Sequence, residues 1–224
     1  GVHQQQAVFQ DLMQRWLPEG GQVLILGAAD AGSLQVLDVA RQGTPVHFTL
    51  MDRCAAPLED ARAWARSRNL PLETREADVS RTELGGPWDL ILVHNTLVLM
   101  DAEARARTLS ALHRALAPHG VILCNMRYAE SGQIDLARLI EDEVASIART
   151  VRGTFAAEPA LVDALLPMIR PNVTAQTRSL SERADRVGFL RELQAAGLAV
   201  LESHPERNAM RAMVSEFNAD LHIR

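Results

Sequence analysis

Short apolar runs alternate with amphipathic stretches along the first half of the chain. The run at 23–26 (Val-Leu-Ile-Leu) has the length and composition of a strand that is buried on both faces. Between such runs, apolar residues recur three or four positions apart, as they do in an amphipathic helix. Five strands separated by helices predict an α/β fold with a parallel sheet and right-handed crossovers. The other predicted strands are 46–51, 70–77, 90–93 and 121–124, and helices are predicted at 34–40, 58–65 and 102–117.

The pattern changes after the fifth predicted strand. Residues 134–190 read as successive helices, and Pro159, Pro167 and Pro171 interrupt the second half of that segment. We expect the segment to be a helical insertion over one end of the sheet. Helix and strand signals resume at 189–201, and the last twenty residues fit either a helix or a final edge strand.

Composition narrows the class of protein. Hydrophobic residues make up 47% of the chain and charged residues 23%, which is typical of a globular protein. The net charge of −5 argues against a protein built to hold a nucleic-acid backbone. Without a long apolar run or a secretory pattern at its start, the chain is expected to be cytoplasmic and free of membrane contact. Cys54 and Cys124 have no metal-ligand spacing, so we expect reduced thiols and no metal site.

Four residues at predicted strand ends carry the candidate chemistry: Gly27, Asp52, Asp78 and His94. In an open parallel sheet a ligand binds beyond the carboxyl ends of the strands. A carboxylate at Asp52 can accept both hydroxyls of a ribose, and one at Asp78 can accept the amine of an adenine. The alternative is that each aspartate caps the helix that follows it.

The loop after the first strand limits the kind of nucleotide. Its sequence at 27–32 is Gly-Ala-Ala-Asp-Ala-Gly, which does not supply the G-x-G-x-x-G pattern of a dinucleotide site. The chain also has no G-x-x-x-x-G-K-[ST] phosphate loop. A ligand with ribose and adenine but no phosphate, such as S-adenosylmethionine, therefore fits better than a nicotinamide dinucleotide.

At this point the chain resembles the class I S-adenosylmethionine-dependent methyltransferases. The most distinctive match is Arg-x-Leu-x-Pro-x-Gly at 114–120, which is similar to the family's turn from a helix into the fifth strand. In this chain Pro118-His119-Gly120 is expected to form that turn. Further stretches that look like family motifs are 23–32, 50–52, 76–79 and 87–95.

The resemblance implies a doubly wound, mostly parallel seven-stranded sheet whose seventh strand is antiparallel. It also implies S-adenosylmethionine as the cofactor and S-adenosylhomocysteine as the product. Where the family usually has an acid in the first strand this chain has Ile25, and Ala29 and Ala31 stand where glycines are usual, so we expect a reshaped loop. The implied cofactor-binding residues are Gly27, Ala28, Ala29, Asp30, Gly32, Asp52, Arg53, Asp78, Val79 and His94.

Four polar side chains are candidates for contact with the methyl acceptor. The resemblance places His94 beside the transferred methyl group, where it is expected to act as a general base or to hydrogen-bond the acceptor. Asn95, Arg127 and Tyr128 are predicted to contact the substrate. The alternatives are a histidine bonded to the backbone, an asparagine that caps a helix, and a solvated loop arginine.

These expectations give a domain plan. An N-terminal helix at 1–20 lies over the cofactor site, and the α/β core occupies 21–128. Residues 129–187 form a helical lid for the substrate, and 188–224 complete the core sheet.

The leading hypothesis is methyl transfer to an oxygen, nitrogen or sulfur atom of a small molecule, because a lid of this size encloses a small acceptor. The insertion is also a candidate homodimer interface. The alternatives are a protein or RNA methyltransferase, a non-catalytic binding or scaffold protein, and a nicotinamide-dependent oxidoreductase.

Overall fold

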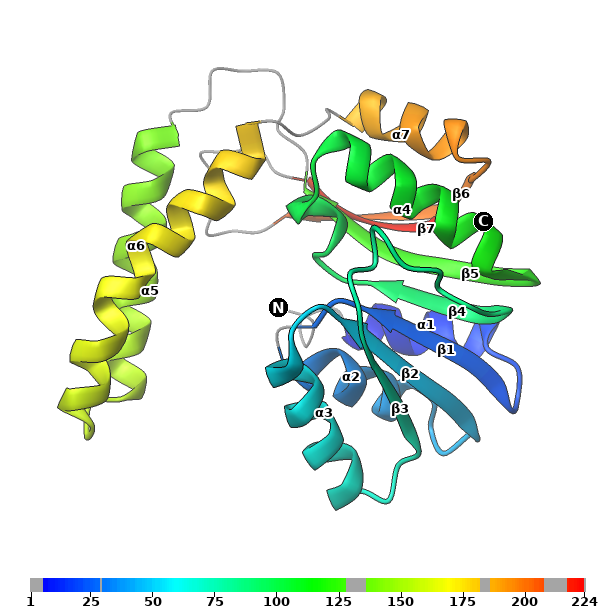
Figure 1. Cartoon of the computed structure of the whole chain (residues 1–224), viewed down its shortest axis with the longest axis horizontal. Coiled ribbons are helices and arrows are strands. Elements are labelled where there is room, and N and C mark those ends of the chain that lie inside the picture. The colour runs from blue at the N-terminus through cyan, green and yellow to red at the C-terminus, as the bar shows by residue number, and fades with distance from the viewer. Residues whose placement is uncertain (1–5, 29, 128–135, 182–185, 208–216, 224) are drawn as a thin grey trace.

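A seven-stranded sheet with helices on both faces forms the body of the molecule (Figure 1). The computed structural model describes residues 6–28, 30–127, 136–181, 186–207 and 217–223. Strand order is β3-β2-β1-β4-β5-β7-β6. β1 to β5 are parallel to one another, and β7 runs antiparallel to both of its neighbours. The strands are β1 (Gly21–Leu26), β2 (Val46–Asp52), β3 (Leu72–Glu76), β4 (Trp88–Val93), β5 (Leu116–Arg127), β6 (Val200–Arg207) and β7 (Phe217–Ile223).

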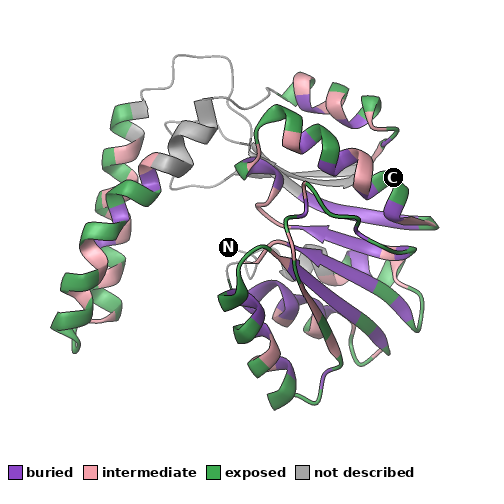
Figure 2. Cartoon of the chain, viewed as in Figure 1, coloured by how far each residue is buried: buried purple, intermediate pink, exposed green. Residues whose placement is uncertain are grey.

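The parallel α/β sheet predicted from the apolar runs is confirmed. Each strand alternates its side chains between two helical layers, as β1 illustrates. Val23 and Ile25 pack against α1, α2 and α3, whereas Leu24 and Leu26 pack toward α4 and α7. All four side chains are fully buried, and Figure 2 shows the same burial along the central strands. The helices are α1 (Gln6–Trp16), α2 (Gly32–Ala40), α3 (Ala55–Ser67), α4 (Ala102–Ala115), α5 (Leu136–Thr154), α6 (Pro159–Ser181), α7 (Arg186–Ala195) and the short 3₁₀-helix η2 (Leu97–Leu99).

The predicted turn at Pro118-His119-Gly120 is wrong, because these residues lie within β5. Trp88 pairs with Leu116 and Leu90 pairs with Val121, so β5 carries extra residues between two points of pairing with β4. A Cβ on Gly120 would lie 2.4 Å from the carbonyl oxygen of Trp88, so only glycine fits this close approach. The helix before it accordingly ends at Ala115, two residues earlier than predicted.

The expectation that prolines interrupt the helical segment is also wrong, because Pro167 and Pro171 lie inside one helix, α6. A proline inside a helix removes one backbone hydrogen bond. The carbonyls of Asp163 and Pro167 lose their helical partners in this way. Asp163, Pro167 and Pro171 are all exposed, so water can bind there. Pro159 opens the helix, a position that proline favours.

α5 and α6 form a hairpin that stands beyond the carboxyl ends of the central strands (Figure 1). The two helices bury a small core of their own, centred on Ala148, Ile169 and Val173. Arg170 donates two hydrogen bonds of 2.6 Å to Glu141 across the hairpin. Toward the sheet, α6 packs against η2, which follows β4.

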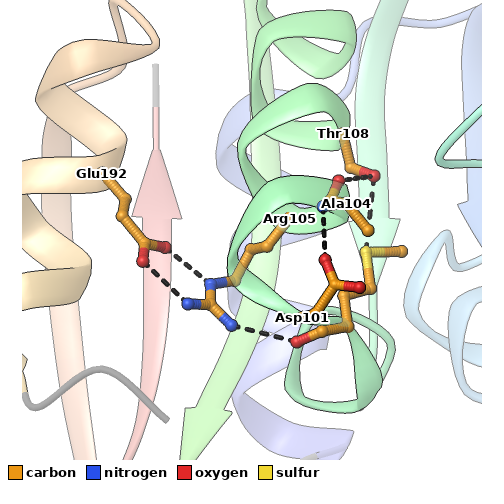
Figure 3. Close-up of polar contacts among 6 residues, drawn as sticks. Asp101, Ala104, Arg105, Thr108 and Glu192 are labelled. Carbon is orange, nitrogen blue, oxygen red and sulfur yellow. Dashed lines mark hydrogen bonds and ion pairs between the residues drawn. The ribbon is translucent and has the colours of Figure 1, made fainter. Parts of the chain in front are cut away.

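A buried ion pair joins α4 to α7 (Figure 3). The Arg105 guanidinium, 2% exposed, donates to both carboxylate oxygens of Glu192 at 2.6 and 2.7 Å. It also donates to the carbonyl of Met100 at 3.1 Å, at the end of η2. Arg105 therefore connects three parts of one helical layer, namely the end of η2, α4 and α7.

At the start of the chain, α1 packs along α2. Its Leu12 and Met13 are buried in the core of that layer. Its predicted position over a cofactor stays a prediction. In the part of the chain that the structure describes, no helix is both long and apolar enough to cross a membrane.

Candidate functional site

The order of strands reverses at β1, which lies between β2 and β4. From β1 the chain proceeds to β2 and β3 on one side, and to β4 and β5 on the other. Ligands of open α/β sheets bind at such a switch point, beyond the carboxyl ends of the strands. Gly27, Asp52 and His94 directly follow or end the three strands that meet there, as predicted.

Asp52 binds the backbone of two loops at once. Its Oδ2 accepts a hydrogen bond of 2.8 Å from the N–H of Ala28, and its Oδ1 accepts one of 2.7 Å from Cys54. The first bond holds the loop after β1 and the second holds the start of α3. Each carboxylate oxygen has a second lone pair, so the half-buried carboxylate retains acceptor capacity for a ribose.

The helix-cap alternative for Asp52 is therefore only partly right. Cys54, not Asp52, is the N-cap residue of α3. The bond from Asp52 goes to the N–H of that cap residue and supports the helix end indirectly.

Gly27 is required by its surroundings as well as by its conformation. Its φ is +75°, in the left-handed region that favours glycine. A Cβ at this position would lie 2.1 Å from Oγ1 of Thr96, closer than any real contact. Its N–H donates to the carbonyl of Met51 at 2.9 Å. The backbone after β1 is thus fixed from both neighbouring strands.

The reshaping expected for the rest of this loop stays a prediction, and the described residues show how the loop is held. Ala31 has φ −74° and ψ 0°, so it carries none of the left-handed strain that a glycine position would impose. Asp30 accepts a hydrogen bond of 2.7 Å from the N–H of Gly32, the first residue of α2. Its carboxylate supplies the negative charge that a helix N-terminus attracts. Ala29 lies outside the described residues.

Asp78 lies on the exposed side of the site, next to β3. Its Oδ1 accepts hydrogen bonds from the hydroxyl and the N–H of Ser80, at 2.7 and 2.9 Å. Those two bonds, and the positive charges of Arg81 and Arg53, hold the pKa of Asp78 below its usual range. No helix follows Asp78 before β4, so the helix-cap alternative is wrong for this residue. Val79, next to it, is buried in the core.

His94 and Asn95 follow β4, and both are half-buried. Asn95 has φ +55°, a left-handed conformation that asparagine tolerates better than most residues. Its Nδ2 lies 3.4 Å from Nδ1 of His94. When the Asn95 amide donates to Nδ1, a neutral His94 ring carries its own proton on Nε2. Thr96, not Asn95, is the N-cap residue of η2, so the cap alternative for Asn95 is wrong.

The side chains of two predicted substrate residues lie outside the described part of the chain. The backbone of Arg127 pairs with Asn218 of β7, but its side chain lies outside the described part, as does all of Tyr128.

Thr96 was not predicted as a site residue. Its hydroxyl donates to the carbonyl of Leu26, 70 residues away, at 2.8 Å.

Among the residues that the structure describes, no group of His, Cys, Asp or Glu side chains could hold a metal ion.

A family profile described as a methyltransferase domain matches residues 23–120, from β1 into β5. This range contains the turn at Gly27, the carboxylate of Asp52, and His94 at the end of β4. This match is consistent with a class I S-adenosylmethionine-dependent methyltransferase. A search of curated proteins finds no match to the chain.

Solved structures share the fold of this chain at low identity. Mitomycin 7-O-methyltransferase MmcR is 17% identical with a TM-score of 0.61, and the match covers 98% of this chain and 53% of that one. The methyltransferase CalH, crystallised with S-adenosylhomocysteine, is 12% identical with a TM-score of 0.63, covering 98% and 55%. The [4+2]-cyclase SpnF is 13% identical with a TM-score of 0.63, covering 97% and 79%. The chain thus spans about half of the length of the first two. At this identity the likeness shows the fold alone.

The donor set of the domain fits the cofactor of its family. S-adenosylmethionine offers ribose hydroxyls and an adenine amine as hydrogen-bond donors, and the strand ends present carboxylates at Asp52 and Asp78. Fully buried Ile25 faces the α1–α3 layer, so the first strand supplies no acid to the site. Negative charge at the loop after β1 comes instead from Asp30, within the loop, and from Asp52, which accepts a bond from Ala28.

Proposed function

We propose that this domain binds S-adenosylmethionine across the carboxyl ends of β1, β2 and β3. Asp52 accepts the ribose hydroxyls, and Asp78 accepts the exocyclic amine of adenine. The backbone of Gly27 and Ala28 lines the ligand. Arg53, Val79, Asp30, Gly32 and Ala29 complete the surroundings that the family resemblance implies.

The single observation that carries this proposal is the double hydrogen bond at Asp52. It fixes one carboxylate between the loop after β1 and the start of α3, with no counter-ion among the bonds that hold it. A carboxylate oriented in this way is prepared to accept two hydroxyls side by side. Bonds from hydroxyls to a charged acceptor contribute about 1.5–3 kcal/mol each.

We further propose that the enzyme methylates an oxygen, nitrogen or sulfur atom of a small molecule. The cofactor supplies a methyl group that is already electrophilic, so the protein's task is to align the acceptor and accept its proton. His94 at the end of β4 is the proposed base. Asn95, Arg127 and Tyr128 are the proposed acceptor contacts.

The proposed architecture has a role for the segments outside residues 23–120. β6 and β7 complete the family's seven-stranded sheet, and the α5–α6 hairpin encloses the acceptor from beyond the strand ends. The same hairpin is a candidate homodimer interface, because Ile140, Val144 and Ile147 stay only partly buried against its small core. We propose a cytoplasmic location, because Cys54 is exposed and Cys124 is buried within β5, an arrangement that fits reduced thiols.

Calorimetry with S-adenosylhomocysteine tests the cofactor site. Asp52→Asn keeps the shape of the side chain but removes its charge, and it is expected to weaken binding at least about tenfold. Asp89→Asn is the matched control. Its carboxylate also accepts one backbone bond, 2.8 Å from the N–H of Gln22, but at the opposite end of the sheet. Equal affinity in both variants would remove Asp52 from the site.

Methyl transfer is then measured as release of S-adenosylhomocysteine with panels of phenols, amines and thiols. Turnover with one panel member and none with RNA or protein supports the small-molecule acceptor.

One observation favours a non-catalytic alternative. Asp30 occupies the N–H of Gly32 at the start of α2, a group that is otherwise free to meet a ligand. Cofactor binding without turnover on any acceptor would support that alternative.

A further inference from the structure

Thr96 joins the two loops that the proposed function places on either side of the reacting atoms. Its Oγ1 donates to the carbonyl of Leu26 at 2.8 Å, and the carbonyl of His94 lies 3.2 Å from the same oxygen. Its side chain also packs on Gly27, where a Cβ would lie 3.1 Å from both carbons of the threonine side chain. One side chain after β4 thus fixes the last residue of β1 and the first residue of the loop.

The hydroxyl makes this bond in place of a helix-cap bond. Thr96 is the N-cap residue of η2, and a threonine there ordinarily accepts a bond from the N–H of the helix that it begins. Here the side chain makes no such cap bond. The left-handed backbone of Asn95 turns the chain so that the hydroxyl meets β1 instead.

The residues that follow Thr96 are held in place as well. Leu97 and Val98 of η2 are 0% and 4% exposed in the core, and α6 packs against η2. The connection therefore runs from the Gly27 loop, through Thr96, to the base of the α5–α6 hairpin.

We infer that Thr96 is a positioning residue for methyl transfer. Thr96 holds His94, at the end of β4, at a fixed distance from the Gly27 loop that lines the cofactor. It therefore sets the position of the cofactor's methyl group relative to the residues that contact the acceptor. This inference rests on the proposed function. A small displacement between aligned reactants is costly, so a residue that fixes their separation affects the reaction without touching it.

The test combines calorimetry with S-adenosylhomocysteine and NMR of bound S-adenosylmethionine labelled with ¹³C in its methyl group. Thr96→Val keeps the shape and removes the hydroxyl. It is expected to weaken affinity about tenfold and to move the methyl resonance of the bound cofactor. Thr96→Ser keeps the hydroxyl and is expected to bind within about twofold of wild type, with the resonance unmoved.

Thr108→Val is the matched control. Its hydroxyl likewise donates to a backbone carbonyl, that of Ala104 at 2.9 Å, but within α4, where Thr108 is fully buried. This variant is expected to change thermal stability and neither binding readout. A purely structural role for Thr96 would give the same result as this control.

A double variant tests the contact with Gly27. Gly27→Ala puts a methyl group against the threonine hydroxyl, and Thr96→Ala removes that hydroxyl. The combined loss of affinity is therefore expected to be smaller than the product of the two single losses.

The outcomes separate the two proposals. Wild-type protein that binds neither S-adenosylmethionine nor S-adenosylhomocysteine would overturn the proposed function and this inference together. Wild-type binding with an unmoved methyl resonance and unchanged affinity in Thr96→Val would overturn the role of Thr96 alone.

Discussion

The ion pair between Arg105 and Glu192 gives a quantitative test of how the helical layer is held together (Figure 3). Glu192→Gln keeps the side-chain shape but removes the charge that faces the guanidinium. Arg105 is 2% exposed and retains as acceptors the carbonyl of Met100 and the amide oxygen of the new glutamine, both uncharged, so its charge is left buried without a counter-ion. Loss of one partner of a buried pair costs about 3–5 kcal/mol. Because Glu192 is 24% exposed, water relieves part of the cost, and we expect about 3 kcal/mol.

That loss is a large part of the stability of a typical domain, about 5–15 kcal/mol. For a chain of this size it corresponds to a fall in melting temperature of about 6–12 °C. Urea denaturation measures it directly as a lower midpoint at an unchanged m-value. Glu103→Gln is the control on the same helix, since its ion pair with Arg107 is exposed and is expected to contribute less than about 1 kcal/mol.

A double variant checks the cause. Arg105→Met combined with Glu192→Leu replaces the pair with apolar side chains and is expected to regain most of the lost stability. The reasoning is refuted if Glu192→Gln is no more destabilising than Glu103→Gln, or if the double variant is less stable than both single ones.

Three further predictions concern side chains at or near the surface of the molecule. His94→Gln is expected to lower turnover by about 10²-fold or more while affinity for S-adenosylhomocysteine stays within about threefold, and steady-state kinetics with calorimetry would show if both fell together. Ser80→Ala removes the hydroxyl bond that lowers the pKa of Asp78 and keeps the bond from the backbone N–H, so that pKa rises part of the way toward its usual value in an NMR titration. Since the folded-state pKa of Asp78 is depressed, its stabilising contribution is present at neutral pH and is lost as pH falls through the folded value, and this acid dependence is weaker in the variant. Arg170→Met likewise removes the hydrogen bond and the charge that hold the pKa of Glu141 low, but both groups are exposed, so the unfolding midpoint is expected not to move.

The strand ends were predictable because buried parallel strands leave an unambiguous signal. A run such as 90–93 is apolar at every position, since helices cover both faces of the sheet, and the first polar residue marks its carboxyl end. His94 was located by that rule, whereas Gly27 and Asp52 were located as the residues at which the predicted strands 23–26 and 46–51 end. Residue bounds were less predictable where a strand continues through a bulge, as β5 does at Pro118–Gly120.

Thr96 and Arg105 could not be predicted from local sequence. The hydrogen-bond acceptor of Thr96 lies 70 residues away, and a threonine before a short helix reads as an ordinary cap. Arg105 reads as the polar side of an amphipathic helix, whereas the structure buries it together with Leu109 and Leu112. In both cases the partner comes from an element that only the tertiary fold brings near.

A crystal structure with S-adenosylhomocysteine bound tests the central claim most directly. The account predicts both ribose hydroxyls within hydrogen-bond distance of the Asp52 carboxylate, the adenine amine beside Asp78, and the sulfur facing His94 at the end of β4. Asp52 and Asp78 turned to solvent, with the ligand bound elsewhere on the molecule, would contradict it.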